Sequence, residues 1–328
     1  MRAETTEVAG WLKARDRIAV VTHLHPDGDA LGSSIALALA LRAIGKRAFA
    51  CCQDGAPDFL DMLPTGGNLF PPEDMPFEPE AVIAVDCAAL NRLGRAAALL
   101  RPETPLACVD HHLAVDVPAS PALVDPRAAA AGELIGEVID ALGAPLDGTL
   151  ALCLYVAVST DTGNFSFDCT TPGCLRLTAR CLEAGLDLNE LNYALFRRRT
   201  AARTKLLGRA LNGLEFSEGG RLALMRVRRA DFAACGAADA DTEGIVNFGI
   251  DAAGVEIALL AVELEGAGGV KFSARSRGEI SVAAMLAPLG GGGHAKAAGL
   301  TLRTDFDAAV DAVMDAARKA LDNTGGDK

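Results

Sequence analysis

The sequence predicts an α/β protein built around a parallel sheet, followed by a second, smaller α/β domain. The first observation is a set of short runs of β-branched and small apolar residues, which is the pattern of strands buried on both faces. These runs are residues 17–22, 48–52, 81–85 and 106–109. The second observation is the helical segments between some of these runs, because parallel strands need crossover connections. The third is size, since 328 residues, half of them hydrophobic, suit two domains with a core each.

Local patterns place the N-terminal elements. Residues 5–16 form an amphipathic pattern, and residues 30–44 are an Ala- and Leu-rich helix that Gly45 ends. A Gly- and Asp-rich turn at residues 25–29 separates the first strand from this second helix. Further helices are expected at 130–142, 149–158, 172–184 and 188–212.

From Arg221 onward the pattern changes to that of a second sheet. The strands expected there are 222–227, 255–264 and 270–274, and the helices expected to pack on them are 241–249, 279–287 and 305–321. We place the domain boundary along the helix 188–212. The predicted division is therefore residues 1–190, a helical connector at 191–219, and residues 220–328.

Composition limits the classes of partner. The chain has 31 Lys and Arg against 43 Asp and Glu, a net charge of −12, which disfavours a protein that grips long duplex nucleic acid. An anionic substrate held by metal ions remains compatible with this charge. The N-terminus has no apolar segment of a secretory signal, and the longest apolar run, Leu150 to Val158, is too short to span a bilayer. The nine cysteines form no C-x-x-C pair, so we expect reduced thiols, a cytoplasmic location and no membrane contact.

Acidic and imidazole side chains follow the first strand. The segment His23-Leu-His-Pro-Asp27-Gly-Asp29 lies at the carboxyl end of a parallel strand, where open α/β sheets bind their ligands. Gly28 lets the chain turn there. One imidazole and two carboxylates that converge there make a site for a divalent cation. The alternative interpretation is a polar turn in which an Asp caps the next helix.

Two further strands and one helix end in the same way. Asp86 follows the run 81–85, and Asp110-His111-His112 follows the run 106–109. Asp161 follows the apolar helix 149–158. The candidate metal ligands are therefore His23, Asp27, Asp29, Asp86, His111 and Asp161. This set can hold two divalent ions with one bridging carboxylate, and its mixture of carboxylate and imidazole favours Mn²⁺ over Mg²⁺ or structural zinc. Asp110 would orient one of the two histidines.

These motifs resemble those of the DHH phosphoesterases, a family named for the triplet seen here at Asp110-His111-His112. The segments around His23, Asp86, the triplet and Thr160-Asp161-Thr-Gly match its four motifs in order. His25 is a departure, because relatives typically carry Asn there, and we expect it to support the loop. The second half resembles the family's DHHA1 domain through Lys271-Phe-Ser-Ala-Arg275-Ser and the run Gly290 to Gly299.

The resemblance implies an N-terminal parallel-sheet DHH domain, a smaller α/β DHHA1 domain, and an active site in the cleft between them. The compact form resembles the branch that trims short oligoribonucleotides and dephosphorylates 3′-phosphoadenosine 5′-phosphate (pAp). It implies two Mn²⁺ ions, with Mg²⁺ or Co²⁺ as substitutes, and the possibility of a homodimer. Cyclic or linear dinucleotide phosphodiesterases on the same scaffold are the alternative, followed by a non-catalytic nucleotide-binding protein.

The resemblance also implies roles for single residues. The catalytic set is Asp86, which bridges the metals, His112, which stabilises charge on the phosphoryl group or leaving oxygen, and Asp110. The predicted substrate-binding residues are Arg275, Ser276, Gly292, Gly293, His294 and Arg92. Exposed backbone N–H groups in the four-glycine run Gly290 to Gly293 can hold an anion, whereas such runs alone are commonly plain turns.

One basic segment stands out in this acidic chain. Between Phe196 and Ala230 there are ten Lys and Arg against Glu215 and Glu218. The segment is either a positive lining that attracts oligonucleotides or a solvated helix face. Phe165 has two comparable interpretations, a stacking surface for a base or a core aromatic.

Overall fold

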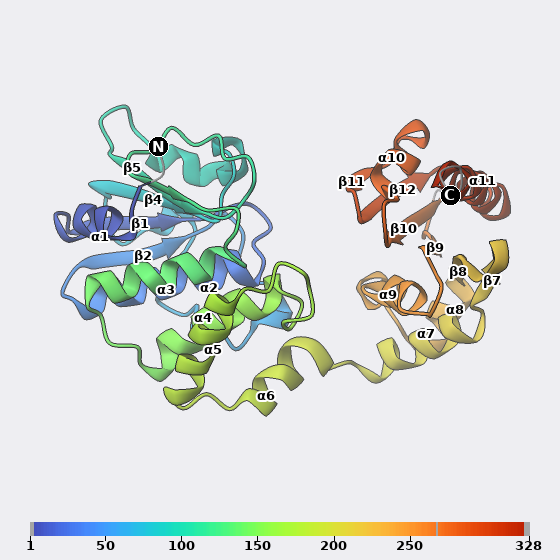
Figure 1. The fold of residues 1–328 in the computed structure, drawn as a ribbon, viewed down its shortest axis with the longest axis horizontal. Helices are drawn as coiled ribbons and strands as arrows, with labels where there is room; N and C mark the ends of the chain where they lie inside the picture. Colours follow the sequence, from blue (N-terminus) through green and yellow to red (C-terminus); the bar gives the residue numbers. More distant parts are fainter. Residues whose placement is uncertain (1–2, 267, 325–328) are drawn as a thin grey trace. The chain divides into compact units, whose positions relative to one another are not determined.

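The computed structural model describes residues 3–266 and 268–324, and it divides the chain into two compact units (Figure 1). The first unit comprises residues 1–198 and the second residues 199–328. No helix among the described residues is both long enough and apolar enough to cross a membrane.

The first unit contains a six-stranded sheet of order β3-β2-β1-β4-β5-β6, in which every neighbouring pair is parallel. Its strands are β1 Arg17–Val21, β2 Arg47–Cys51, β3 Leu69–Phe70, β4 Ala81–Val85, β5 Leu106–Asp110 and β6 Ala122–Val124. The predicted parallel sheet is thus confirmed. Strands β3 and β6 were not predicted because two or three residues are too few to produce a pattern. The strand order reverses between β1 and β4, which is where ligands bind in open α/β sheets.

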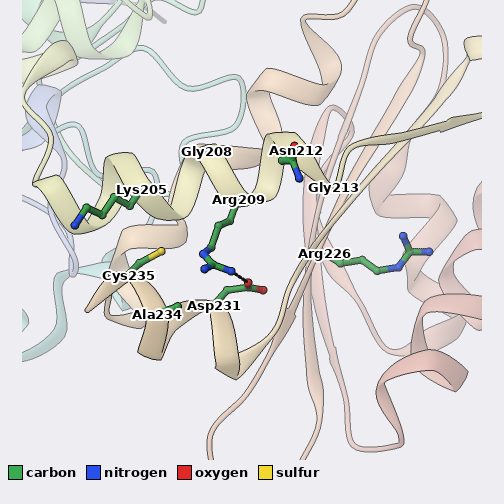
Figure 2. Close-up of a pocket in the computed structure, with 9 residues that line it drawn as sticks. All are labelled: Lys205, Gly208, Arg209, Asn212, Gly213, Arg226, Asp231, Ala234 and Cys235. Atoms are coloured by element: carbon green, nitrogen blue, oxygen red, sulfur yellow. Dashed lines mark hydrogen bonds and ion pairs between the residues drawn. The ribbon is translucent and has the colours of Figure 1, made fainter.

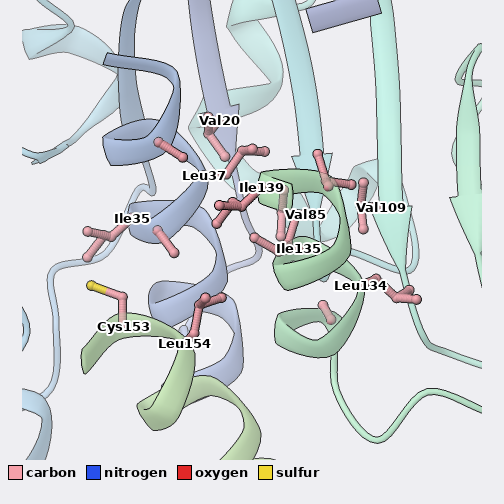
Figure 3. Packing of buried hydrophobic residues seen from close by; sticks show 14 of the residues in the cluster. Val20, Ile35, Leu37, Val85, Val109, Leu134, Ile135, Ile139, Cys153 and Leu154 are labelled. Atoms are coloured by element: carbon pink, nitrogen blue, oxygen red, sulfur yellow. The ribbon is translucent and has the colours of Figure 1, made fainter. Parts of the chain in front are cut away.

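Helices and one 3₁₀ segment, η1, lie on one face of this sheet, and the 3₁₀ segment η3 covers the other. The helices are α1 Thr5–Lys13, α2 Gly28–Ala43, α3 Ala131–Leu142, α4 Gly148–Asp161, α5 Pro172–Glu183 and α6 Leu188–Asn192, with a π-helix η4 at Tyr193–Arg197. The 3₁₀ segments are η1 Asp58–Leu60, η2 Pro72–Asp74 and η3 Leu90–Leu99. Figure 3 shows side chains of α2, α3 and α4, among them Ile35, Ile135 and Leu154, packed with Val85 and Val109 of the sheet. On the opposite face, Leu93 and Ala96 of η3 pack on the strands.

Helix α2 is buried over most of its length because it lies between the sheet and α4. A Cβ at Gly32 would lie 2.4 Å from the carbonyl oxygen of Cys153, so only glycine permits this approach. The contact explains why residues 30–44 read as an Ala- and Leu-rich helix without a polar face. It also brings the start of α2 beside the end of α4.

The second unit contains a mixed six-stranded sheet of order β11-β12-β10-β9-β8-β7. Its strands are β7 Glu215–Ser217, β8 Leu222–Val227, β9 Ile257–Glu263, β10 Val270–Ser276, β11 Gly292–His294 and β12 Ala297–Leu302. Strands β8 and β9 are parallel, and the other neighbours are antiparallel. Its helices are α7 Ala201–Asn212, α8 Arg229–Cys235, α9 Ile245–Ile250, α10 Val282–Leu286 and α11 Phe306–Thr324, with 3₁₀ segments η5 Glu218–Gly220, η6 Asp239–Thr242 and η7 Ala287–Leu289.

Both faces of this sheet carry helices, although not equally. Helices α10 and α11 pack on one face through residues such as Leu286 and Val313. Helices α7, α8 and α9 pack on the other face against β8 and β9, through residues such as Phe232 and Val246. The outer strands β10, β12 and β11 therefore keep part of this second face open.

Three expectations for the elements are wrong in detail. The continuous helix 188–212 is interrupted at residues 198–200, because Arg198 is extended and the hydroxyl of Thr200 caps α7. The helix 241–249 is a 3₁₀ turn and a short α9, separated by Gly244 in the left-handed region. The glycine run is not a free loop, since Gly292–His294 pair with β12 as an edge strand.

Candidate active site

His23 leaves β1 at the sheet edge that carries the predicted ligands. Its side chain is 5% exposed, and its Nδ1 lies 2.7 Å from the carbonyl oxygen of Leu24. A proton on Nδ1 satisfies that carbonyl and leaves the Nε2 lone pair free. Nε2 lies 3.6 Å from Oδ2 of Asp86 and 4.0 Å from Oδ1 of Asp27.

Asp27 caps a helix, as one of its two sequence interpretations predicts, and its position is compatible with the other. Its Oδ1 accepts a hydrogen bond of 3.0 Å from the backbone N–H of Ala30, so it caps α2. Its side chain is nevertheless 56% exposed and lies within the same cluster as His23 and Asp86. Because a carboxylate has four acceptor positions, the cap leaves capacity for a cation.

Asp29 lies in the first turn of α2 and is almost completely buried. It accepts hydrogen bonds from Ser33 Oγ at 2.8 Å and from the backbone N–H groups of Ala131 and Gly132 at 2.6 and 2.8 Å. Its Oδ2 lies 3.6 Å from Nε2 of His111. The start of α3 therefore holds this carboxylate in place.

His111 joins Asp29 to Asp161. Its Nε2 is 3.3 Å from Oδ2 of Asp161, which is the last residue of α4, and its Nδ1 lies 3.4 Å from the carbonyl oxygen of Ala128. As at His23, a backbone carbonyl faces one ring nitrogen while the other faces carboxylates. In each ring the contact with a carbonyl leaves Nε2 directed at carboxylates, the orientation that a metal-binding imidazole needs.

Asp86 lies between the two groups. Its Oδ2 faces His23, and its Oδ1 lies 3.7 Å from Nε2 of His111 and 3.5 Å from Nδ1 of His112. The residue is 2% exposed, its backbone φ is 51°, and within the described parts of the chain Oδ1 has no hydrogen-bond partner. A left-handed aspartate with an unpaired buried oxygen costs stability, and such costs concentrate at functional sites.

The residues present fit divalent cations. Three groups of side chains each offer ligand atoms within 4.8 Å of one another: His23, Asp27 and Asp86; Asp29, His111 and Asp161; and Asp86, His111 and His112. The donors are carboxylate oxygens and imidazole nitrogens without a thiolate, a mixture that suits first-row divalent ions. A cation near Asp86 would also satisfy its unpaired oxygen.

Electrostatics within the cluster point the same way. Burial, with the charges of Asp86 and Asp161, raises the pKa of Asp29 well above its ordinary value. Burial and the charge of Asp86 raise the pKa of Asp161 to about 6, although the nearby His111 opposes this. Burial lowers the pKa of His23, but the nearby carboxylate of Asp86 and the hydrogen bond to the Leu24 carbonyl outweigh it and raise that pKa overall. The site concentrates more negative charge than it can stabilise without cations.

Asp110 and His112 form a tight pair beside this cluster. Asp110 is fully buried, and its Oδ1 accepts from the backbone N–H of His112 at 2.9 Å and faces Nδ1 at 2.7 Å. Burial raises the pKa of Asp110, but these hydrogen bonds from His112 lower it overall. The same hydrogen bond, opposed by burial, raises the pKa of His112. The ring is 38% exposed, so Nε2 can reach a ligand.

Arg92 lies exposed on η3, and its positive charge slightly opposes the rise that Asp110 causes in the pKa of His112. Within the described ranges its guanidinium has no ion pair, so it is free for an anion. His25 is not part of the metal cluster. Its imidazole is 92% exposed, and its backbone, at φ 52°, donates a 2.8 Å hydrogen bond to Oδ2 of Asp54.

Asp54, which directly supports the His23 to Asp29 loop, was not predicted from the sequence. It lies three residues after the end of β2, so an acid shortly after a buried strand was an available signal. Residues 128–132, whose backbone groups hold Asp29 and His111, were not predicted either. Because every residue has the same backbone groups, the sequence of an Ala- and Gly-rich segment does not show which of them make such contacts.

In the second unit, the open part of the sheet brings three of the predicted substrate-binding residues together. Arg275, Gly292 and Gly293 line a shallow pocket of about 530 Å³, which Lys271 and Thr301 also line. His294 is exposed at the end of β11. Ser276 is buried, and its hydroxyl donates a 2.7 Å hydrogen bond to the carbonyl of Ile280. This placement favours a supporting role for Ser276 over direct substrate contact.

Most of the basic segment is neutralised by ion pairs. Figure 2 shows the ion pair between Arg209 and Asp231 in a surface pocket that Lys205 and Arg226 also line. A guanidinium nitrogen of Arg209 lies 3.0 Å from Oδ1 of Asp231. The six basic residues of the segment with acidic partners are Arg198, Arg209, Arg221, Arg226, Arg228 and Arg229. In the described chain, those without an acidic partner are Arg197, Arg199, Arg203 and Lys205. For six of the ten basic residues, these ion pairs support the interpretation of the segment as an ordinary solvated surface.

Phe165 is half-buried at the margin of the core. Its ring centroid lies 6.2 Å from that of the buried Tyr155, and the side chain packs against the core of the first unit. These contacts favour its interpretation as a packing residue over that as a base-stacking surface.

Comparisons with known proteins agree with this description. Residues 17–158 match the model of the DHH family, N-terminal domain, and residues 232–323 match that of the DHHA1 domain. The bifunctional oligoribonuclease and PAP phosphatase NrnA of Thermus thermophilus is 34% identical over 97% of this chain and 94% of the relative. The protein of the same name from Bacillus subtilis is 24% identical over 90% of this chain and 93% of the relative. A crystal structure of an exopolyphosphatase-related protein from Bacteroides fragilis superposes with a TM-score of 0.84 at 22% identity, covering 97% of this chain and 95% of that one.

Proposed function

Because the chain belongs to the DHH phosphoesterase family and carries a DHHA1 domain, we propose that it hydrolyses short oligoribonucleotides and pAp with two bound Mn²⁺ ions. The observation that carries this proposal is the position of Asp86, a buried carboxylate with an unpaired oxygen between two groups of metal ligands. The substrates are proposed from the relative of 34% identity, which is named an oligoribonuclease and PAP phosphatase.

We assign one ion to His23, Asp27 and Asp86, and the other to Asp29, Asp86, His111 and Asp161. The choice of Mn²⁺ rests on the mixture of imidazole and carboxylate donors, with Mg²⁺ and Co²⁺ as substitutes. Bound cations supply a water of lowered pKa and polarise the phosphoryl oxygens. The backbone of residues 128–132 and of Leu24 orients the ligands before any substrate arrives.

His112 has a separate part in this proposal. Its Nδ1–H is held by Asp110, so Nε2 can donate a hydrogen bond to a phosphoryl or leaving oxygen when the ring is protonated. Asp110 keeps the ring oriented and stabilises its charge, which makes Asp110 a positioning residue. Arg92, free of acidic partners within the described ranges, contributes a positive charge to the same substrate phosphate.

Substrate binding is assigned to the second unit. We propose that Arg275, Gly292, Gly293 and His294 hold the terminal phosphate of the substrate, since the first three line one open pocket. Catalysis is assigned to residues 1–190 and substrate binding to residues 220–328, with residues 191–219 as the connector.

The test is a substrate panel with the purified, metal-stripped chain reconstituted with Mn²⁺, Mg²⁺, Co²⁺ or Zn²⁺. The substrates are pAp, RNAs from two to 24 nucleotides, linear pApA and cyclic dinucleotides. We expect Mn²⁺-dependent release of mononucleotides from the shortest RNAs and of phosphate from pAp. Turnover of dinucleotides alone would favour a dinucleotide phosphodiesterase, and binding without turnover would favour a nucleotide-binding protein.

A further inference from the structure

A second pocket lies on the same sheet edge as the metal cluster. It occupies about 440 Å³ beyond the ends of β2 and β3, and its lining includes Gln53, Asp54, Thr65, Leu69, Phe70 and Pro71. Since β1, β2 and β3 are parallel neighbours, the residues that follow β2 and β3 lie at the same carboxyl end of the sheet as His23.

Two contacts join this pocket to the loop that carries His23 and Asp27. The thiol of Cys52, which lines the pocket, donates to the carbonyl oxygen of His23 at 3.1 Å. The carboxylate of Asp54, also in the lining, accepts the backbone N–H of His25 at 2.8 Å. The wall of the pocket is therefore the outer support of the loop that carries His23 and Asp27.

The lining chemistry distinguishes this pocket from a phosphate site. Among the described residues that line it there is one carboxylate and no Lys, Arg or His, so an anion would be repelled. Leu69, Phe70 and Pro71 offer apolar surface, and Phe70 meets Phe49 edge-to-face at 5.2 Å. Asp54, Gln53 and Thr65 offer hydrogen-bonding groups. A flat, neutral ring with N–H donors satisfies both sets of residues.

We infer that this pocket binds a nucleobase of the substrate while the adjacent phosphate lies at the metal cluster. The inference rests on the proposed function and deepens it by naming a base subsite within the first unit. The Asp54 carboxylate accepts N–H groups of the base, and the apolar wall contacts its face. This arrangement makes a nucleotide a better substrate than the same sugar-phosphate without a base.

The test uses substitutions that fill the pocket and leave the residues of the loop that carries His23 and Asp27 unchanged. Gly55 and Gly66 line it, neither has a left-handed φ, and a Cβ at either position meets no atom within 4 Å. Gly55→Phe and Gly66→Phe are therefore compatible with the fold. Gly10→Phe, at an equally open position on α1, is the matched control. Asp54 is left intact because it also supports His25.

Each protein is assayed with Mn²⁺ on pApA and on the abasic form of the same dinucleotide. We expect the wild type and Gly10→Phe to prefer pApA by about tenfold or more in kcat/KM, the size of one base contact. The two pocket variants lose most of this preference through a higher KM, while their rate on the abasic substrate stays unchanged. Binding of adenosine in competition with pApA weakens in parallel.

Three results would overturn the inference, the third together with the proposed function. A full base preference in both pocket variants would overturn it alone, as would equal rates of the wild type on the two substrates. No hydrolysis of either substrate by the wild type with any metal would overturn the proposed function together with the base subsite. The abasic substrate thus distinguishes the two failures.

Discussion

At the residue scale, the site contains a few residues whose conformation or burial lowers the stability of the folded protein. Asp86 combines a left-handed backbone with a buried, unpaired oxygen, and burial, together with neighbouring acids, raises the pKa of Asp29. Such features destabilise the metal-free protein and persist where they serve function. Removing one of them should separate activity from stability.

Asp86→Asn provides that separation. The amide preserves the shape of the side chain but cannot bridge two cations, so we expect Mn²⁺-dependent hydrolysis of pAp to fall by about a thousandfold or more. In EDTA, the Tm of the variant should equal or exceed that of the wild type, because a buried charge is lost. Hydrolysis near the wild-type rate would contradict the role of Asp86.

Asp161 predicts a pH dependence of stability without metal. Its pKa is raised from 3.8 to about 6 in the folded state, so the folded protein holds this proton more tightly than the unfolded chain. The ionised group therefore costs stability as pH rises through this range, and costs nothing below it. In EDTA, Asp161→Asn should raise Tm by a few degrees at pH 7.5, with the gain shrinking toward pH 4. An equal gain at both pH values would contradict this origin.

At the element scale, the close packing of α2 on α4 sets the spacing of the ligands. Helix α2 carries Asp29 in its first turn, and α4 ends at Asp161. Gly32 permits the approach of the two helices, and a Cβ at Gly28 would overlap the hydroxyl of Thr160. The small residues thus serve the geometry of the site as well as the core.

Gly32→Val tests this packing. The added atoms meet the Cys153 carbonyl, and we expect a loss of about 2 kcal/mol in the free energy of unfolding. Mn²⁺ affinity, measured by calorimetry, should also weaken. Gly10→Ala is the control, because its site on α1 is open and alanine favours a helix. Its denaturation midpoint should stay equal or rise slightly, and a comparable loss there would contradict the packing argument.

At the scale of the whole molecule, the candidate metal ligands among the described residues all lie in the first unit. Every group of potential ligands found among the described residues lies between His23 and Asp161. The acidic chain thus gathers several of its carboxylates and three of its five histidines in one cluster, while the second unit offers an open pocket lined by Lys271 and Arg275.

Metal binding should therefore stabilise one unit selectively. Trp11 is the single tryptophan of the chain and lies in α1, so its fluorescence reports on the first unit. We expect Mn²⁺ to raise the fluorescence midpoint on heating, and EDTA to lower it. Circular dichroism should reveal a second transition whose midpoint does not follow the metal. A single transition that shifts as a whole would show that the two units unfold together.

Much of the fold, and the gathering of the predicted ligand residues in one cluster, could be predicted from the sequence. Runs such as 81–85 indicate buried parallel strands, and acids directly after them lie at one edge of the sheet because parallel strands end together. Short strands such as β3, and the break at residues 198–200, leave no such local pattern. The conformation of the glycine run likewise depends on pairing with a later strand.

By itself, the sequence determined the order of the strands along the chain, the chemistry of the ligands and the family resemblance, since these depend on residue types and short spacings. Only the tertiary structure decided which groups support the ligands: residues 128–132 around Asp29 and His111, and Asp54 behind His25. It also decided that ion pairs neutralise most of the basic segment. The physical reason is that these contacts join residues distant in the chain through backbone groups and charges, whose partners no local pattern specifies.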